Sequence, residues 1–229
     1  SNKRVSWTGI LPDNGKMKKA DVMTFYSRLR DANPEPVGEL HYVNPYTLLV
    51  AVALSAQATD VGVNKATRPL FEKVKTPEAM VKLGLEGIRD HIKTIGLFNT
   101  KAKNVLALSE LLIEQHGSIV PDDQAELEAL PGVGRKTANV VRNMAFGAPT
   151  IAVDTHIYRV GNRTGLAPGK TPLAVEKKLL KATPDEFALH AHHWLILLGR
   201  YICKARKPDC PNCIVADVCR FKGKTTLEG

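Results

Sequence analysis

The chain has 229 residues, of which 44% are hydrophobic, so it can bury the core of one large domain or two small ones, and wholesale disorder is excluded. It contains no run of about 18 uncharged apolar residues, and residues 1–15 lack the apolar run of a secretory signal, which predicts a soluble intracellular protein. The net charge of +9, from 32 Lys and Arg against 23 Asp and Glu, favours a polyanionic partner such as nucleic acid over charge that serves solubility alone.

Apolar residues recur at helical spacing along most of the chain, and Gly or Pro separates the segments. Residues 45–56 are apolar on most faces, which predicts a helix at the centre of a bundle. The other predicted helices are residues 59–71, 77–82, 85–92, 99–116, 124–129, 135–145, 155–165, 172–181 and 194–202. No alternating run is long enough to build a sheet. The sequence therefore predicts an all-α fold, with its best candidate for a domain boundary at residues 147–149.

The sequence LPGVG, residues 130–134, joins two of these short helices. Gly132 and Gly134 can adopt positive φ and let the backbone come close to a ligand. The amides of the turn and of the following helix start can bind one phosphate. The glycine spacing differs from that of a nucleotide-binding P-loop and matches a helix-hairpin-helix, which holds the DNA backbone without reading sequence. The alternative is a tight turn with a purely structural role.

Lys136 lies in the first turn of the helix that follows, beside Arg135. The partial positive charge of a helix amino terminus disfavours an ammonium group, and Arg135 acts in the same direction. An amine whose charged form is disfavoured can act as a nucleophile. The alternative, which the residues alone leave equally open, is a lysine that contacts phosphate.

Asp154 stands where the apolar segment 151–153 meets a predicted helix. A carboxylate at this junction can cap the helix by accepting hydrogen bonds from its first amides. If the same carboxylate faces Lys136, it can help to deprotonate the amine and can stabilise positive charge that develops on a sugar. Capping and catalysis are compatible, because a cap fixes the direction of the carboxylate.

All four cysteines of the chain lie within one short segment, as Cys203, Cys210, Cys213 and Cys219. This grouping indicates a metal or cluster site and argues against a disulfide framework. Four cysteines can hold a structural zinc ion or a 4Fe–4S cluster. Zinc sites usually have two separated Cys-x-x-Cys pairs, whereas this segment has one, so the spacing leans modestly to iron–sulfur.

Three basic residues, Lys204, Arg206 and Lys207, lie between the first two cysteines. A basic loop held by a cluster is suited to contact phosphates. The alternative is a solvated charged surface without a partner.

Three motifs together resemble the bacterial endonuclease III family of helix-hairpin-helix DNA glycosylases with AP lyase activity. They are LPGVGRKTA at residues 130–138, VDTHI at residues 153–157 and the cysteine spacing. SAQATD at residues 55–60 and TIGL at residues 94–97 are similar to that family as well. The resemblance covers roughly residues 18 to 222. The residues before Lys18 lie outside it and are expected to form either a disordered extension or an extra DNA contact.

The resemblance implies a fold of two domains. A six-helix barrel would span residues 38–148, and residues 1–37 and 149–229 would form a domain that holds a 4Fe–4S cluster. Double-stranded DNA would bind in the cleft between the domains with the lesion flipped out of the stack. The implied protein is a monomer of the bacterial cytoplasm, associated with the nucleoid, that excises oxidised pyrimidines and cuts the strand at abasic sites by β-elimination.

The resemblance also implies the roles of single residues. Lys136 would attack the sugar and form a Schiff base, and Asp154 would be the catalytic carboxylate. Gln57 and Leu97 match residues that fill the gap left by the flipped nucleotide, and His156 matches one near the lesion. Without the resemblance, Gln57 is interpreted as a polar residue at the edge of the core, Leu97 as core packing and His156 as helix surface.

Two rival functions remain open at this point. A monofunctional adenine glycosylase of the same superfamily shares the hairpin, the aspartate and the cluster but lacks a lysine at the position of Lys136. A non-catalytic helix-hairpin-helix module would bind DNA but would not need Lys136 and Asp154 together. The joint presence of both residues favours the bifunctional enzyme.

Overall fold

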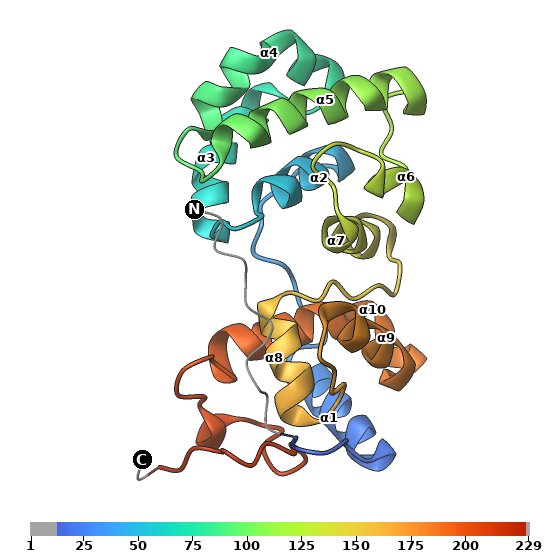
Figure 1. Ribbon diagram of the computed structural model, residues 1–229, viewed down its shortest axis with the longest axis vertical. Coiled ribbons are helices and arrows are strands. Elements are labelled where there is room, and N and C mark those ends of the chain that lie inside the picture. The colour runs from blue at the N-terminus through green and yellow to red at the C-terminus, as the bar shows by residue number, and fades with distance from the viewer. Residues whose placement is uncertain (1–12, 228–229) are drawn as a thin grey trace. The chain divides into compact units, whose positions relative to one another are not determined.

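The computed structural model describes residues 13–227, and every regular element in that range is helical (Figure 1). The α-helices are α1 (Lys19–Ala32), α2 (Pro45–Leu54), α3 (Asp60–Lys73), α4 (Pro77–Ile92), α5 (Phe98–His116), α6 (Gln124–Glu128), α7 (Arg135–Phe146), α8 (Thr155–Thr164), α9 (Pro172–Ala182) and α10 (Asp185–Leu197). A π-helical turn, η1 (Leu198–Ile202), continues α10, and a short 3-10 turn, η2 (Cys210–Asn212), lies among the cysteines. The prediction of an all-α fold is confirmed. None of the described helices combines the length and the apolar character that crossing a bilayer would require.

The chain divides into two compact units. The hairpin unit, residues 38–148, contains α2 to α7. The cysteine unit comprises the described residues up to Val37 together with those from Pro149 onward, and it contains α1, α8, α9, α10, η1 and η2.

Helix α2 forms the centre of the hairpin unit. It starts at a capping box, in which the side chain of Asn44 accepts from the amide of Thr47 at 2.8 Å and the Thr47 hydroxyl accepts from the amide of Asn44 at 3.0 Å. Every residue from Tyr46 to Leu54 is buried, and α2 packs against α3, α5 and α7. The apolar character of most faces of residues 45–56 thus correctly indicated a central helix, which ends at Leu54.

Helix α4 covers two of the predicted helices, residues 77–82 and 85–92. Gly84 separates them with φ +76, a left-handed conformation that interrupts the helix and that glycine adopts without steric cost. Helix α4 packs along α5, and their buried faces complete the core of the hairpin unit.

In the cysteine unit, α1 was not among the predicted helices, although its sequence carried the signal. Val22, Phe25, Tyr26 and Leu29 recur at helical spacing and form the buried face of α1. The ring of Tyr26 stacks on Phe187 of α10 with centroids 5.4 Å apart.

The start of α10 was predicted nine residues too late, at Trp194. The helix begins at Asp185 instead, where Pro184 precedes it and the acidic Asp185 and Glu186 suit the positive end of a helix. Its buried face includes Phe187, Ala191 and Trp194, which pack against α1.

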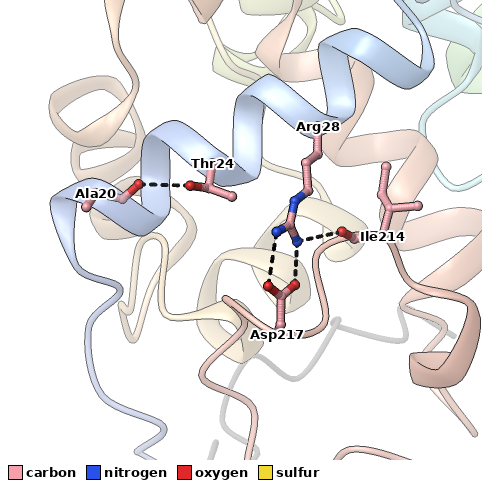
Figure 2. Close-up of polar contacts among 5 residues, drawn as sticks. All are labelled: Ala20, Thr24, Arg28, Ile214 and Asp217. Atoms are coloured by element: carbon pink, nitrogen blue, oxygen red, sulfur yellow. Dashed lines mark hydrogen bonds and ion pairs between the residues drawn. The ribbon is translucent and has the colours of Figure 1, made fainter.

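Arg28 ties α1 to the cysteine segment, as Figure 2 shows. Its guanidinium pairs with both carboxylate oxygens of Asp217, with Nη2 to Oδ2 at 3.0 Å, and donates to the carbonyl of Ile214 at 3.0 Å. Both partners lie between Cys213 and Cys219, so one side chain of α1 holds the last cysteine loop.

The residues just before α1 are also packed. The amide of Met17 donates to the carbonyl of Gly165 at 2.7 Å, and Met17 and Asn14 are buried. For residues 13–17 the expectation of a disordered extension is therefore wrong, because these contacts fix them against the end of α8. The rest of that segment, residues 1–12, lies outside the described residues.

Candidate functional site

The turn between α6 and α7 is anchored by two apolar side chains. Leu130 and Val133 are buried, and the amide of Val133 donates to the carbonyl of Leu130 at 3.1 Å. Between them Gly132 has φ +77, and a Cβ on it would lie 2.9 Å from Cβ of Asn104 in α5. The left-handed backbone expected for Gly132 is therefore confirmed, and its close packing on Asn104 leaves no room for a side chain; its approach to a ligand stays a prediction.

Gly134 does not adopt the positive φ that a glycine allows. Its φ is −97 and it precedes α7 in an extended conformation, so only the first of the two glycines is left-handed. Because a single left-handed residue is enough to reverse the turn, Gly134 is free to act as the N-cap of α7. As a glycine it places no capping side chain on the first amides of the helix.

Arg135 and Lys136 are the first two residues of α7, and both are exposed. The first amides of an α-helix have no acceptor within the helix, and together with the helix dipole they attract an anion. Below them, Asn139 and Asn143 are buried, and the side-chain amide of Asn143 donates to the carbonyl of Ala148 at 2.9 Å. The exposed Lys136 thus lies in the first turn of a helix that has no capping side chain at its start and is held near its other end, and anion binding there stays a prediction.

Asp154 is the N-cap of α8, and its Oδ1 accepts from the amide of Ile157 at 2.8 Å. The residues before it, Ile151 to Val153, are buried, and the amide of Ala152 donates to Nδ1 of His192 at 3.2 Å. His192, itself buried in α10, was not predicted as a site residue. The capping interpretation of Asp154 is correct, and the cap fixes the direction of its carboxylate. Asp154 belongs to the cysteine unit and Lys136 to the hairpin unit, so their pairing stays a prediction.

His156 lies on the first turn of α8 and is half-buried, more enclosed than a surface position. Burial lowers the pKa of His156; the charge of Asp154 opposes this, and the charges of Arg159 and Arg200 add to it. Nη2 of Arg159 lies 3.2 Å from Nδ1 of the imidazole and donates to the carbonyl of Gly199 at 2.6 Å. The contact requires a neutral imidazole with Nδ1 as acceptor.

Gln57 and Leu97 share a conformation that is uncommon for residues with side chains. Gln57 has φ 55 in the loop between α2 and α3, and Leu97 has φ 60 directly before α5. Both are exposed, and Leu97 is 58% exposed. The alternative of core packing for Leu97 is therefore wrong. A strained backbone that presents an exposed apolar side chain is typical of a functional position.

The four cysteine side chains line one cavity, together with Leu198, Val215 and Phe221. All four thiols are free of disulfide bonds. Burial raises the pKa of the Cys213 thiol to about 11, and burial also raises the pKa of Cys219. Within residues 13–227, no group of three or more His, Cys, Asp or Glu side chains could hold a single metal ion.

Two arginines of α8 support the loop that carries the basic residues. Arg159 donates to the carbonyl of Cys203 at 2.9 Å, and Arg163 donates to the carbonyls of Lys204 at 2.7 Å and Ala205 at 2.9 Å. The predicted contact residues Lys204, Arg206 and Lys207 are exposed. Arg159 and Arg163 were not predicted, although their spacing of four residues places both on one face of a helix.

Comparison with known proteins matches residues 50–185 to the family described as HhH-GPD superfamily base excision DNA repair protein. The chain is 58% identical over 211 residues to endonuclease III of Escherichia coli (strain K12), covering 92% of this chain and all of that protein. It is 58% identical to endonuclease III of Haemophilus influenzae (strain ATCC 51907 / DSM 11121 / KW20 / Rd) over 91% of this chain and 98% of that one. A solved structure of a trapped endonuclease III–DNA covalent intermediate, an estranged-adenine complex, is similar with a TM-score of 0.83. It has 45% identity and covers 89% of this chain and 96% of that chain.

The hairpin geometry predicts different effects for its two glycines. Gly132→Ala should lower the free energy of unfolding by about 1–3 kcal/mol, because it adds a left-handed alanine and a contact with Asn104. Gly134→Ala is the matched control: its φ is extended and nothing lies within 4 Å of a new Cβ, so we expect a loss below about 1 kcal/mol. Urea unfolding measures both. Equal losses for the two variants would contradict the assigned conformations.

Proposed function

The chain belongs to the endonuclease III family, within the HhH-GPD superfamily of base excision DNA repair proteins, and from this premise we propose which residues carry its chemistry. Members of this family are bifunctional: the protein is a DNA glycosylase with AP lyase activity. Lys136 is the nucleophile. The observation that carries this proposal is an exposed amine in the first turn of α7, directly after the hairpin turn. The similar structure in which endonuclease III is trapped covalently on DNA supports it.

The reaction begins when the Nζ lone pair of Lys136 attacks C1′ of the damaged nucleotide. The bond from C1′ to the base breaks, and the base leaves with the electron pair and takes up a proton. Asp154 accepts the proton that the amine loses and stabilises the positive charge that develops on the sugar. Its cap on α8 supports this role, because the hydrogen bond from Ile157 holds one carboxylate oxygen in place.

Strand cleavage follows from the same covalent bond. The sugar ring opens and the nitrogen of Lys136 becomes the iminium of a Schiff base, which acidifies the protons on C2′. Loss of one such proton to a base or to water expels the 3′ phosphate by β-elimination, and water then releases the amine. A glycosylase that uses water instead of an amine would stop at base removal, so Lys136 links the two activities.

We propose that several residues around this chemistry bind double-stranded DNA. The hairpin residues Gly132, Gly134 and Arg135 hold one phosphate at the start of α7. Gln57 and Leu97 enter the gap left by the flipped nucleotide, and His156 lies near the lesion. The exposed Lys204, Arg206 and Lys207 contact phosphates. The net charge of +9 supports a DNA partner of this kind.

The cysteine segment fits a cluster of the 4Fe–4S type. Its donor set consists of thiols alone, and all four side chains line one cavity with apolar walls. Cys203, Cys210, Cys213 and Cys219 would hold the cluster, which when bound links both ends of this segment through iron–sulfur bonds. The same residues would thereby fix the basic loop between Cys203 and Cys210.

The proposed substrates are oxidised pyrimidines and abasic sites in duplex DNA, as the likeness to the family implies. We propose that a monomer acts, on the nucleoid DNA of the bacterial cytoplasm. The residues 38–148 would be the six-helix barrel, and the two chain ends, residues 1–37 and 149–229, the cluster domain. The division of the chain into a hairpin unit and a cysteine unit supports this assignment.

Borohydride trapping on abasic duplex DNA tests the nucleophile. The wild-type protein should give a covalent adduct, because reduction converts the Schiff base to a stable amine, and Lys136→Ala should give none. Lys103→Ala is the control, since it removes an exposed lysine of α5 outside the proposed site. An adduct with undiminished yield in Lys136→Ala would assign the nucleophile to another residue.

Asp154→Asn separates catalysis from capping. Asparagine caps a helix as well as aspartate does, so thermal unfolding should change little. The rate of base removal should fall by about 10²-fold or more, because the amide neither accepts the proton nor stabilises positive charge. If Asp154→Asn retains the wild-type rate, Asp154 is a cap only.

The purified protein should be yellow-brown and contain iron and acid-labile sulfide in equal amounts. Cys213→Ser should reduce both, because the cluster loses a thiolate, and should weaken DNA binding through the basic loop. Elemental analysis and visible absorption measure this outcome. A colourless wild-type protein that carries zinc would overturn the cluster assignment.

A further inference from the structure

Two loops of the hairpin unit present side chains from a strained backbone. One runs from Ser55 to Thr59 and carries Gln57, and the other precedes α5 and carries Leu97. A left-handed conformation at a residue with a Cβ persists only where the surrounding structure determines it. Each loop therefore needs contacts that hold it, and the two loops lie far apart in sequence.

Lys101 contacts both loops. Its amide donates to the carbonyl of Leu97 at 3.0 Å, one helical turn back along α5. Its Nζ donates to the carbonyl of Ala56, the residue before Gln57, at 2.7 Å. One residue thus connects the backbone beside Gln57 with the backbone of Leu97.

The side chain of Lys101 is in an unusual place for a lysine. It is 7% exposed, and burial lowers its pKa. Its neighbours along the buried face of α5, Ala102 and Val105, are apolar. The carbonyl that it contacts follows the end of α2, where the helix dipole favours a cation. An apolar side chain would fill such a position at a lower desolvation cost. The presence of a lysine therefore points to a role for its hydrogen bond and not for packing alone.

We propose that Lys101 is a positioning residue that holds the Gln57 and Leu97 loops together, so that both side chains enter the DNA stack as one rigid wedge. This inference rests on the proposed function, in which Gln57 and Leu97 fill the gap left by the flipped nucleotide. Inserting a side chain between bases costs stacking energy. The loops can separate the bases only if they are stiff enough to keep their own conformation. The charge-assisted hydrogen bond from Lys101 to Ala56 supplies that stiffness.

The test compares Lys101→Met with Lys103→Met, which removes the same charge from an exposed position on the same helix. A 2-aminopurine base opposite an abasic-site analogue in a duplex reports opening of the stack by a rise in fluorescence. In Lys101→Met we expect this rise to be largely lost and single-turnover base removal from a duplex to slow by about tenfold. Trapping on a single-stranded abasic oligonucleotide, which has no stack to open, should stay within about twofold of wild type.

A double variant gives the decisive comparison. If Lys101 acts through the wedge, then adding Lys101→Met to Leu97→Ala should slow the duplex reaction by less than about twofold further. If the rate reduction in the double variant equals the product of the two single reductions, the proposal is overturned. The proposal is also overturned if Lys101→Met slows the reactions on duplex and single-stranded DNA equally, or if its fluorescence rise and duplex rate equal those of Lys103→Met.

Two further outcomes are distinguishable. If wild-type protein forms no adduct on either substrate, the proposed function fails, not the role of Lys101. Should Lys101→Met fail to fold by circular dichroism, Lys101→Arg carries the test, since its guanidinium still donates to Ala56. We expect Lys101→Arg to retain the fluorescence rise, and a folded Lys101→Arg that loses it overturns the proposal.

Discussion

The first amides of an α-helix have no acceptor within the helix, and the two proposed catalytic residues each lie at such a helix start, one in each unit. At α8 the side chain of Asp154 accepts from one of these amides. At α7 the N-cap is Gly134, which has no side chain to offer. The start of α8 thus binds a carboxylate of the chain itself and fixes its direction. The start of α7 leaves its positive end open to an anion from outside the chain. The same physical requirement fixes a carboxylate in one case and leaves amides open to a ligand in the other, which supports the catalytic and phosphate-binding roles proposed for them.

Local sequence rules were sufficient for the parts of the molecule that are locally determined. The apolar run of α2, the LPGVG turn and the N-cap at Asp154 follow from composition and spacing within a few residues. Helix α1, which was not predicted, carries an equally local signal in the helical spacing of Val22, Phe25, Tyr26 and Leu29. The true start of α10 is marked locally as well, by Pro184 and the acidic residues after it.

The contacts that position the site are long-range, and no local rule predicts them. Arg28 holds a loop that lies 189 residues later, and His192 accepts from an amide 40 residues earlier. Leu97 could not be identified as exposed from its sequence, because a leucine before an amphipathic helix is more often buried. Its left-handed φ depends on the surroundings, not on the residue type. The role proposed for Leu97 rests on the family likeness, and its exposed side chain is compatible with that role.

Two lysines of the hairpin unit, Lys136 and Lys101, differ in burial and therefore in what their identical side chains can do. Lys136 is exposed in the first turn of α7, where its amine is accessible from solvent. Lys101 is buried and directs its ammonium to one carbonyl, at the end of a helix that attracts a cation. A nucleophile needs access to its target, which the buried position of Lys101 denies. A stiff connection between two loops needs a fixed donor shielded from water, which an exposed residue such as Lys136 cannot provide. Different environments thus suit the two identical side chains to the different roles proposed for them.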